Sequence, residues 1–165
     1  MTSTPEDVVE RARRCIGHGV AYVLGKGGFR SDTEFPWVTP EDGCDCSGFA
    51  MWCLGLPRQF GGIWYGTDQI VADAKGSSVL FHAVAFADAR PGDLLVYPHP
   101  NPHQHGHVGV VVLCDQGKPS RVIHCSLGGW RNQKDAIQQT GAGLWLVVAK
   151  NAIAVRLNSF TEAGK

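Results

Sequence analysis

Residues 45–54 read DCSGFAMWCL. The apolar residues of this run recur at helical spacing from Cys46 onward, and Asp45 has the side chain of a helix N-cap. Gly55 and Pro57 follow it, and both residue types stop a helix. Since the run is mostly apolar, it predicts a buried central helix that begins at Cys46.

The chain before this helix predicts one further helix and then a long loop. Thr4 supplies an N-cap hydroxyl, Pro5 occupies the first helical position, and the amphipathic pattern ends near Gly17. The segment from Gly25 to Gly43 is rich in glycine, contains two prolines and shows no sustained periodicity. We expect this segment to be a functional loop.

The second half of the chain predicts an antiparallel sheet. A short helix is expected at 67–74, and β-rich segments bounded by turn residues follow it. Connections such as 115–118 are short enough for antiparallel hairpins. Helices first and strands afterwards indicate an α+β fold, formed by a single domain over residues 1–165. The expected strands are 93–97, 107–114, 121–125, 144–150 and 153–157.

The composition excludes several classes of protein. Hydrophobic residues make up 44% of the chain and charged residues 18%, which is typical of a globular protein and not of a disordered one. Because 15 basic residues balance 15 acidic ones, we expect neither nucleic acid nor a membrane as a partner. Residues 1–7 lack the features of a signal peptide, and no apolar stretch could span a bilayer. The chain as written reads as cytoplasmic, and export by a leaderless route to the periplasm or cell wall stays open.

Cys46 is the candidate nucleophile among the six cysteines of the chain. We expect the cysteines to be free thiols, because the hydrophobic core of a domain of this size is large enough to stabilise it without disulfides. A thiol attacks as thiolate, and a helix N-terminus lowers the pKa of a thiol placed there. Ser47 and Gly48 leave the thiol uncrowded. The alternative is that Cys46 is one more buried thiol of the core.

His107 is the candidate base, because imidazole can take a proton from a thiol near neutral pH and return it to a leaving amine. It opens the apolar run 107–112, which would hold its ring on a rigid strand. His124 closes the next expected strand and could hydrogen-bond the second ring nitrogen of His107. The alternative for each is an ordinary histidine at a strand end.

Six segments of the chain together resemble the ordered motifs of the NlpC-type cell-wall cysteine peptidases. Any one of them is weak, but their order and spacing over residues 8–126 make the match specific. The segments are AYVLG (21–25), CDCSGF (44–49), LPR (56–58), RPGDLL (90–95), HVGV (107–110) and VIH (122–124).

The resemblance implies a papain-like core, in which N-terminal helices, including the nucleophile helix, pack on an antiparallel sheet. Members of the family mostly cleave peptidoglycan stem peptides, often between D-glutamate and diaminopimelate. By this resemblance Cys46 attacks the amide, His107 acts first as base and then as acid, and His124 orients His107. The backbone N–H of Cys46 would contribute to the oxyanion hole. The expected partner is a stem peptide or a soluble muropeptide, with no metal and no organic cofactor.

The resemblance also implies substrate contacts. Tyr22 matches a tyrosine beside the family nucleophile, and Asp45 and Ser47 match positions that contact the free amine of the stem peptide. Residues 26–44 form a longer loop than is usual in the family, and three of its aromatic residues could wall the cleft: Phe29, Phe35 and Trp37. Lysin, toxin and recycling enzyme stay open as biological settings, and a toxin would have an inhibitory immunity protein as its partner.

Two other functions compete with a peptidase. His99, His103, His105 and His107 lie close together in the sequence, a density that also suggests a metal-binding module. Prolines interrupt this run, and the histidine spacing fits neither a helix nor a strand that would point several rings at one ion. The run is therefore expected to form a loop and not a metal site. A papain-like acyltransferase or deamidase is the third reading, because a thioester at Cys46 can be passed to acceptors other than water.

Overall fold

Thr4 begins the first helix of the computed structural model, which describes residues 3–162. Its hydroxyl accepts a hydrogen bond from the backbone N–H of Asp7, and the Asp7 carboxylate accepts one from the backbone N–H of Thr4. This capping box, with Pro5 in the first turn, sets the start of α1 (Pro5–Arg14). The predicted helix is confirmed, although it ends at Arg14 and not near Gly17. The ends of the predicted domain 1–165 lie outside the described residues.

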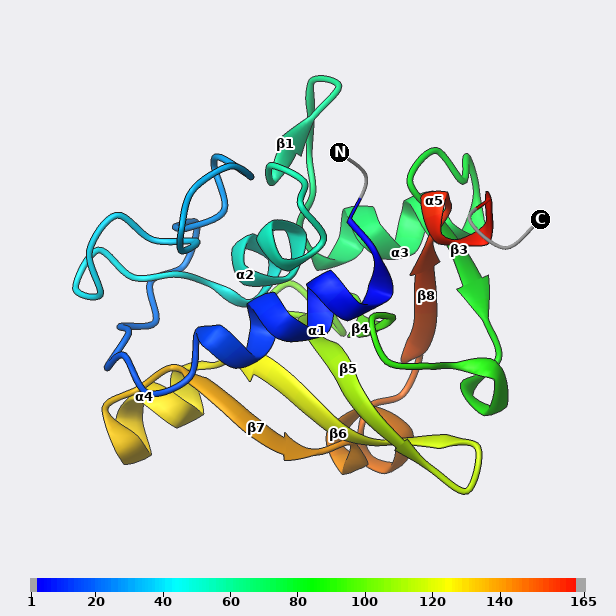
Figure 1. Ribbon diagram of the computed structural model, residues 1–165. Coiled ribbons are helices and arrows are strands. Elements are labelled where there is room, and N and C mark those ends of the chain that lie inside the picture. The colour runs from blue at the N-terminus through cyan, green and yellow to red at the C-terminus, as the bar shows by residue number, and fades with distance from the viewer. Residues whose placement is uncertain (1–2, 163–165) are drawn as a thin grey trace.

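Within residues 3–162, no helix is long and apolar enough to cross a membrane. After α1, the helices are α2 (Cys46–Cys53), α3 (Thr67–Lys75), α4 (Leu127–Gln133) and α5 (Ser159–Glu162), with a 3-10 turn η1 (Phe86–Asp88) and a π-helical turn η2 (Leu144–Val148). The strands are β1 (Gln59–Phe60), β2 (Ile63–Trp64), β3 (Phe81–Val84), β4 (Leu94–Tyr97), β5 (His107–Asp115), β6 (Lys118–Cys125), β7 (Ile137–Gly141) and β8 (Ile153–Leu157). Figure 1 shows these elements along the chain.

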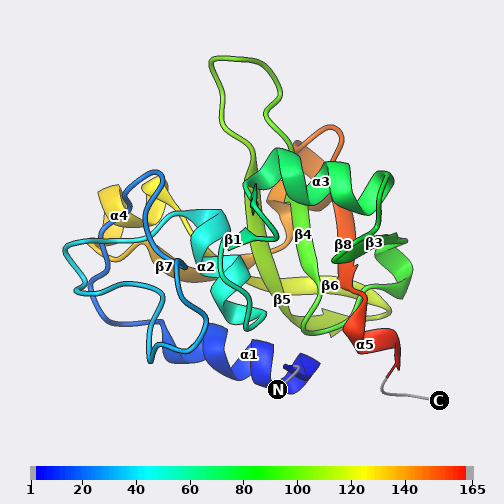
Figure 2. The same ribbon diagram turned by 90° about the horizontal axis from the view of Figure 1, so that it is seen from above.

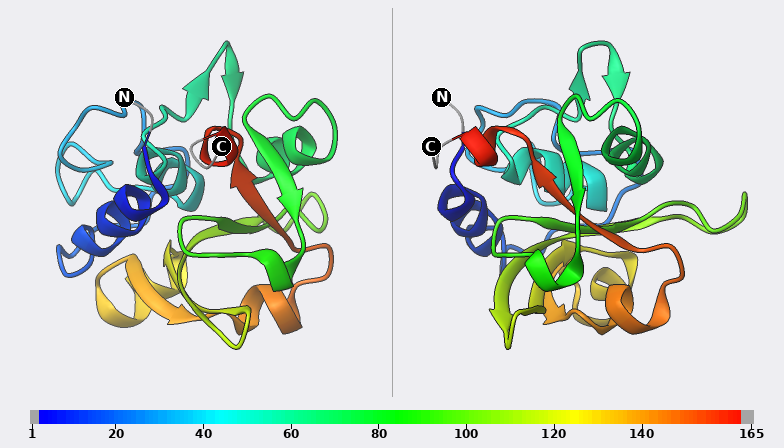
Figure 3. Two further views of the ribbon diagram at one scale, coloured as in Figure 1. Left: turned by 45° about the vertical axis from the view of Figure 1, so that its right-hand side comes forward. Right: turned by 90° about the vertical axis from the view of Figure 1, so that its right-hand side faces the viewer.

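The described strands form a small hairpin, β1–β2, and a six-stranded sheet of order β3-β8-β4-β5-β6-β7, in which all neighbours are antiparallel. Helices α1, α2 and α3 cover one face of this sheet, and η1 and η2 lie against the other (Figure 3). Val110 of β5 belongs to the core on the helix side, and Val111 belongs to the core on the opposite side. Burial on both faces explains the continuous apolar run of this strand. The protein is therefore α+β, as predicted.

The central helix and the central hairpin are confirmed. Every residue of α2 is buried, and the helix starts at Cys46 as predicted. Strands β5 and β6 pair through a tight turn in which Gln116 and Gly117 have φ values of 49° and 73°. Positive φ at both central residues is typical of the two-residue turns that match the twist of a hairpin.

The strand predicted at 144–150 is wrong, because this segment forms the turn η2. The Ala142 carbonyl accepts hydrogen bonds from the N–H groups of both Trp145 and Leu146, so the backbone curls instead of extending. Val147 and Val148 are both exposed, at 83% and 70%, so the alternation of a half-buried strand is also absent. Strands β3 and β7 and helix α4 were not predicted.

The loop between α1 and α2 is held against the start of α2. A short bridge pairs Tyr22 with Cys44, and the Gly28 carbonyl accepts a hydrogen bond from the N–H of Arg58. A Cβ at Gly28 would overlap the backbone of Gly48, so only glycine allows this approach. The loop predicted between Gly25 and Gly43 thus forms part of the surroundings of Cys46.

Candidate active site

Cys46 lies at the first residue of α2, where the Asp45 carboxylate caps the helix by accepting a hydrogen bond from the N–H of Gly48 at 2.8 Å. Its side chain is 6% exposed and lines a pocket of about 180 Å³. We call this hollow the Cys46 pocket; its walls include Tyr22, Ser47, Arg58, Trp64 and His105. A larger hollow of about 480 Å³ beside α1 is lined by neither thiol nor imidazole.

His107 stands at the start of β5, next to the strand residue that contacts the nucleophile. The backbone N–H groups of Val108 and Ser47 lie close enough to the Cys46 thiol to lower its pKa, against the larger effect of burial. The fold therefore brings the start of α2 to the start of β5. Cys46 and Val108, which are 62 positions apart in the sequence, thus lie close together at the strand end where His107 begins β5.

The predicted contact between the two histidines is present. Nε2 of His107 lies 2.7 Å from Nδ1 of His124, which is a short hydrogen bond. The rings meet edge to face, with centroids 4.9 Å apart. Because β5 and β6 form one hairpin, the second histidine is carried on a strand that is rigidly paired with the first. His124 can therefore orient the ring of His107.

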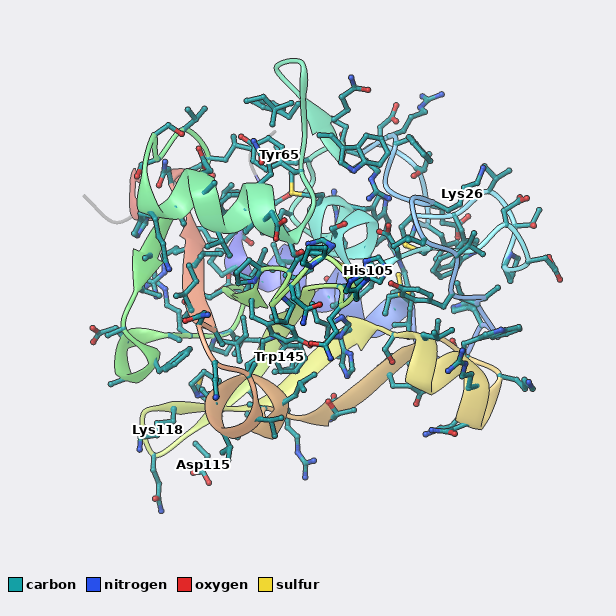
Figure 4. The ribbon with its side chains drawn as sticks, turned by 180° about the vertical axis from the view of Figure 1, so that it is seen from behind. Lys26, Tyr65, His105, Asp115, Lys118 and Trp145 are labelled. Atoms are coloured by element: carbon teal, nitrogen blue, oxygen red, sulfur yellow. The ribbon has the colours of Figure 1, made fainter. Side chains whose placement is uncertain are left out.

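Trp145 fixes both imidazole rings, a role that sequence reasoning missed. Its ring stacks on His107 at a centroid distance of 5.4 Å and an interplanar angle of 16°, and meets His124 edge-on at 5.2 Å. It rises from η2 toward the centre of the molecule (Figure 4) and is 1% exposed. The sequence predicted a strand at this position, and that prediction did not indicate a contact between Trp145 and His107.

Gly109 makes the close approach of these rings feasible, and its replacement by alanine is expected to lower stability. A Cβ there would overlap Cγ1 of Val122 and lie 3.1 Å from Cβ of His124 and 3.2 Å from Trp145. We expect Gly109→Ala to reduce the free energy of unfolding by about 1–3 kcal/mol, measured by urea denaturation. Gly143→Ala is the control, because Gly143 has an ordinary helical φ of −57° and no atom lies near its added Cβ. Equal stability of the two variants would contradict this packing.

Asp45 and Ser47 lie in the wall of the Cys46 pocket, as the resemblance implies, but they are joined there by a buried arginine. The two terminal nitrogens of Arg58 each lie 3.1 Å from a different carboxylate oxygen of Asp45, and one also donates to the Ser47 hydroxyl. Arg58 is 1% exposed, and the ring of Trp64 lies 4.1 Å from its guanidinium carbon. The sequence marked Arg58 only as part of a family-like segment, so this ion pair was missed.

Two tyrosine phenols lie near the thiol. Burial raises the pKa of Tyr22, and the charge of Cys46 raises it further. Burial and Cys46 also raise the pKa of Tyr97, which pairs with His107 across β4 and β5. Both phenols are thus protonated at neutral pH and can donate hydrogen bonds to a substrate or an intermediate. Tyr22 was predicted at this place, and Tyr97 was not.

Burial dominates the protonation of the candidate nucleophile and the candidate base. It raises the pKa of the Cys46 thiol to about 12, and the Asp45 carboxylate adds to this rise. Burial also lowers the pKa of His107 to about 3, with a further lowering by His124. The lowered thiol pKa expected from the helix N-terminus is therefore not found. At neutral pH the free protein therefore holds a neutral thiol at Cys46 and a neutral imidazole at His107.

The alkylation rate of Cys46 by iodoacetamide is expected to rise continuously with pH. Only the thiolate reacts, and a pKa raised to about 12 leaves little thiolate at neutral pH and progressively more at alkaline pH. The rate constant, followed by mass spectrometry of the Cys46 peptide between about pH 6 and pH 10, should show no plateau. A plateau that extends to acid pH would contradict a neutral thiol and would indicate a resting thiolate–imidazolium pair.

The histidine-rich loop between β4 and β5 stands out from the body of the protein (Figure 2) and contributes to the Cys46 pocket. Nε2 of His99 lies 3.2 Å from Nδ1 of His105, and Nδ1 of His99 lies 3.0 Å from the Asp68 carboxylate. Both histidines line the pocket. Among the described residues, no group of three or more His, Cys, Asp and Glu side chains is arranged to hold a metal ion.

Only one of the three loop aromatics expected at the cleft lies beside the pocket. Phe29 packs against Trp64, a wall residue, with ring centroids 5.9 Å apart. Phe35 and Trp37 instead stack on each other at 4.8 Å and contact His18. Part of this loop is therefore packed against itself and away from the pocket.

No protein-family model matches this chain, and a search of curated proteins found no match. The assignment of a function therefore depends on the geometry of the site and on the motifs of the sequence.

Proposed function

We propose that this protein is a papain-like cysteine hydrolase of the NlpC type, which cleaves an amide bond in bacterial peptidoglycan stem peptides. The observation that carries the proposal is the meeting of the Cys46 helix start with the strand start of His107, whose ring is held by His124 at 2.7 Å. The Cys46 pocket gives a substrate carbonyl access to the thiol. A nucleophile, a base and an orienting group on rigid elements are what acyl transfer to a thiol requires.

The reaction follows from the protonation states. His107 takes the thiol proton as Sγ of Cys46 bonds to the amide carbon, and the carbonyl oxygen becomes an oxyanion. The N–H of Cys46, at the helix start, and the phenol of Tyr22 are suited to donate hydrogen bonds to that oxyanion. The C–N bond then breaks, the leaving amine takes the proton from His107, and a thioester remains on Cys46. Water, deprotonated by His107, attacks the thioester carbon, and the C–S bond breaks as the Cys46 sulfur takes the proton back from His107. The carboxylic acid that forms loses its proton to solvent and leaves as the carboxylate.

The proposed substrate is the stem peptide, with the bond between D-glutamate and diaminopimelate as the first candidate. A stem peptide is small and polar, which suits a narrow pocket whose wall carries the hydroxyl groups of Tyr22, Ser47 and Thr67. The chain has no net charge that would favour a polyanion. The support for this bond comes from the resemblance of the motifs.

Mass spectrometry of digests tests the proposal. Purified peptidoglycan and soluble muropeptides would each be incubated with the protein, with Cys46→Ala and with protein treated with a chelator. New stem-peptide fragments are expected from the untreated and chelated protein and not from Cys46→Ala. Fragments from soluble muropeptides alone would favour a recycling enzyme, and fragments from intact peptidoglycan a lysin or toxin. If neither substrate yields fragments, the cell-wall proposal fails.

A further inference from the structure

The hydrogen-bond chain that starts at His107 continues beyond His124. Nε2 of His124 lies 2.9 Å from Oγ1 of Thr140, a residue of β7 that lies beside His124 because β6 and β7 are paired. The Thr140 hydroxyl in turn donates a hydrogen bond to the carbonyl of Gly141 at 3.1 Å. Four groups are thus linked in a line that ends at a backbone carbonyl.

The terminal carbonyl determines the direction of every hydrogen bond in this line. A carbonyl oxygen can only accept, so the single hydroxyl proton of Thr140 is committed to Gly141. Oγ1 of Thr140 must then accept from His124, which places the proton of neutral His124 on Nε2. Nδ1 of His124 therefore has the lone pair and accepts from Nε2–H of His107. The remaining nitrogen of His107, Nδ1, carries its free lone pair.

This direction is the one that general-base catalysis requires. Neutral His107 can take a proton only on the nitrogen that has a lone pair, and Nε2 is occupied by His124. If the line ran the other way, Nδ1 of His107 would carry a proton and could not accept one from the thiol. Trp145 stacks on one face of the His107 ring and so opposes the rotation that would exchange its two nitrogens.

We propose that Thr140 is a positioning residue that sets the tautomers of His124 and His107 and thereby makes Nδ1 of His107 the base. The effect of Thr140 on turnover depends on the proposed function, whereas its effect on the histidine tautomers is independent of that function. Thr140 acts through His124 and contacts neither thiol nor substrate. A threonine serving only as a strand former in β7 would have no such effect on distant nitrogens.

Nitrogen NMR of histidine-labelled protein tests the assignment without any assay of activity. At neutral pH both rings are neutral, because burial lowers the pKa of His107 to about 3 and that of His124 to about 4. We expect long-range proton–nitrogen correlations to show the Nε2–H tautomer for both residues. In Thr140→Val, which keeps the shape but loses the hydroxyl, His124 should become a mixture of tautomers. Thr140→Ser should restore the single tautomer.

Kinetics on the proposed substrate provide the second measurement. Thr140→Val should lower kcat by about tenfold with little change in KM, and Thr140→Ser should recover most of the loss. Gln139→Val, which alters an exposed residue of the same strand, is the control and should leave both constants unchanged. An Nδ1–H tautomer in the wild type, or unchanged tautomers in Thr140→Val, would overturn the proposal. Absence of turnover in the wild type would refute the proposed function, and the NMR result would still decide the role of Thr140.

Discussion

Replacement of Cys46 by alanine is expected to abolish turnover, with a loss of at least about a thousandfold in kcat. The reaction as proposed passes through a thioester on this thiol, and no step can proceed without it. The change removes one buried sulfur atom from the wall of the Cys46 pocket, so the helix and its cap by Asp45 should persist. Fragment release from muropeptides, followed by chromatography, measures the loss.

The matched control for this variant is Cys53→Ala. Cys53 ends the same helix and is fully buried, but it does not line the Cys46 pocket. Both substitutions remove a sulfur atom from the core, so their circular dichroism spectra should be alike while only Cys53→Ala retains activity. Comparable activity in the two variants would remove Cys46 from the mechanism.

Replacement of Arg58 by methionine is expected to lower the free energy of unfolding by about 3–5 kcal/mol. The side chain is buried, and its removal would leave the Asp45 carboxylate without the cation that it faces at 3.1 Å. A buried carboxylate without a cation destabilises the folded state, and replacing it by a neutral amide removes part of this destabilisation. The double variant Arg58→Met with Asp45→Asn should therefore be more stable than Arg58→Met alone. Urea denaturation of the two variants measures the difference.

Arg30→Met is the control for the Arg58 prediction. Arg30 forms an ion pair with Asp32 at 2.8 Å, but both side chains are mostly exposed, at 72% and 67%. Solvent screens such a pair, so its removal should not measurably change stability. If Arg58→Met were as stable as Arg30→Met, the buried ion pair would not anchor the wall of the Cys46 pocket.

The parts of the fold that the sequence predicted are those with long or strongly capped patterns. Helix α2 combines an N-cap aspartate with a continuous apolar run, and β5 begins with a run that is buried on both faces. Strand β7 has a weak hydrophobic pattern in the sequence, because Ile137 is its only fully buried residue. Turn η2 is five residues long, too short for its apolar composition to distinguish a strand from a helical turn.

The parts of the site that could be predicted lie on those same elements. Cys46 and His107 occupy the first positions of α2 and β5, so their neighbours in the sequence revealed them. Arg58, Thr140 and Trp145 reach the site only through tertiary packing, and no local pattern distinguishes them from ordinary residues. The thiol pKa was misjudged for a related reason, because the helix N-terminus is visible in the sequence and burial is not.

Trapping of the acyl-enzyme would show whether Cys46 forms a thioester with the acyl part of a stem peptide. Muropeptides would be incubated with the protein in the presence of hydroxylamine, which attacks thioesters in competition with water, and the products would be analysed by mass spectrometry. We expect the hydroxamate of the acyl fragment beside the free acid with the wild type, and neither product with Cys46→Ala. Cleavage that yields only the free acid, and that persists in Cys46→Ala, would contradict a thioester on Cys46.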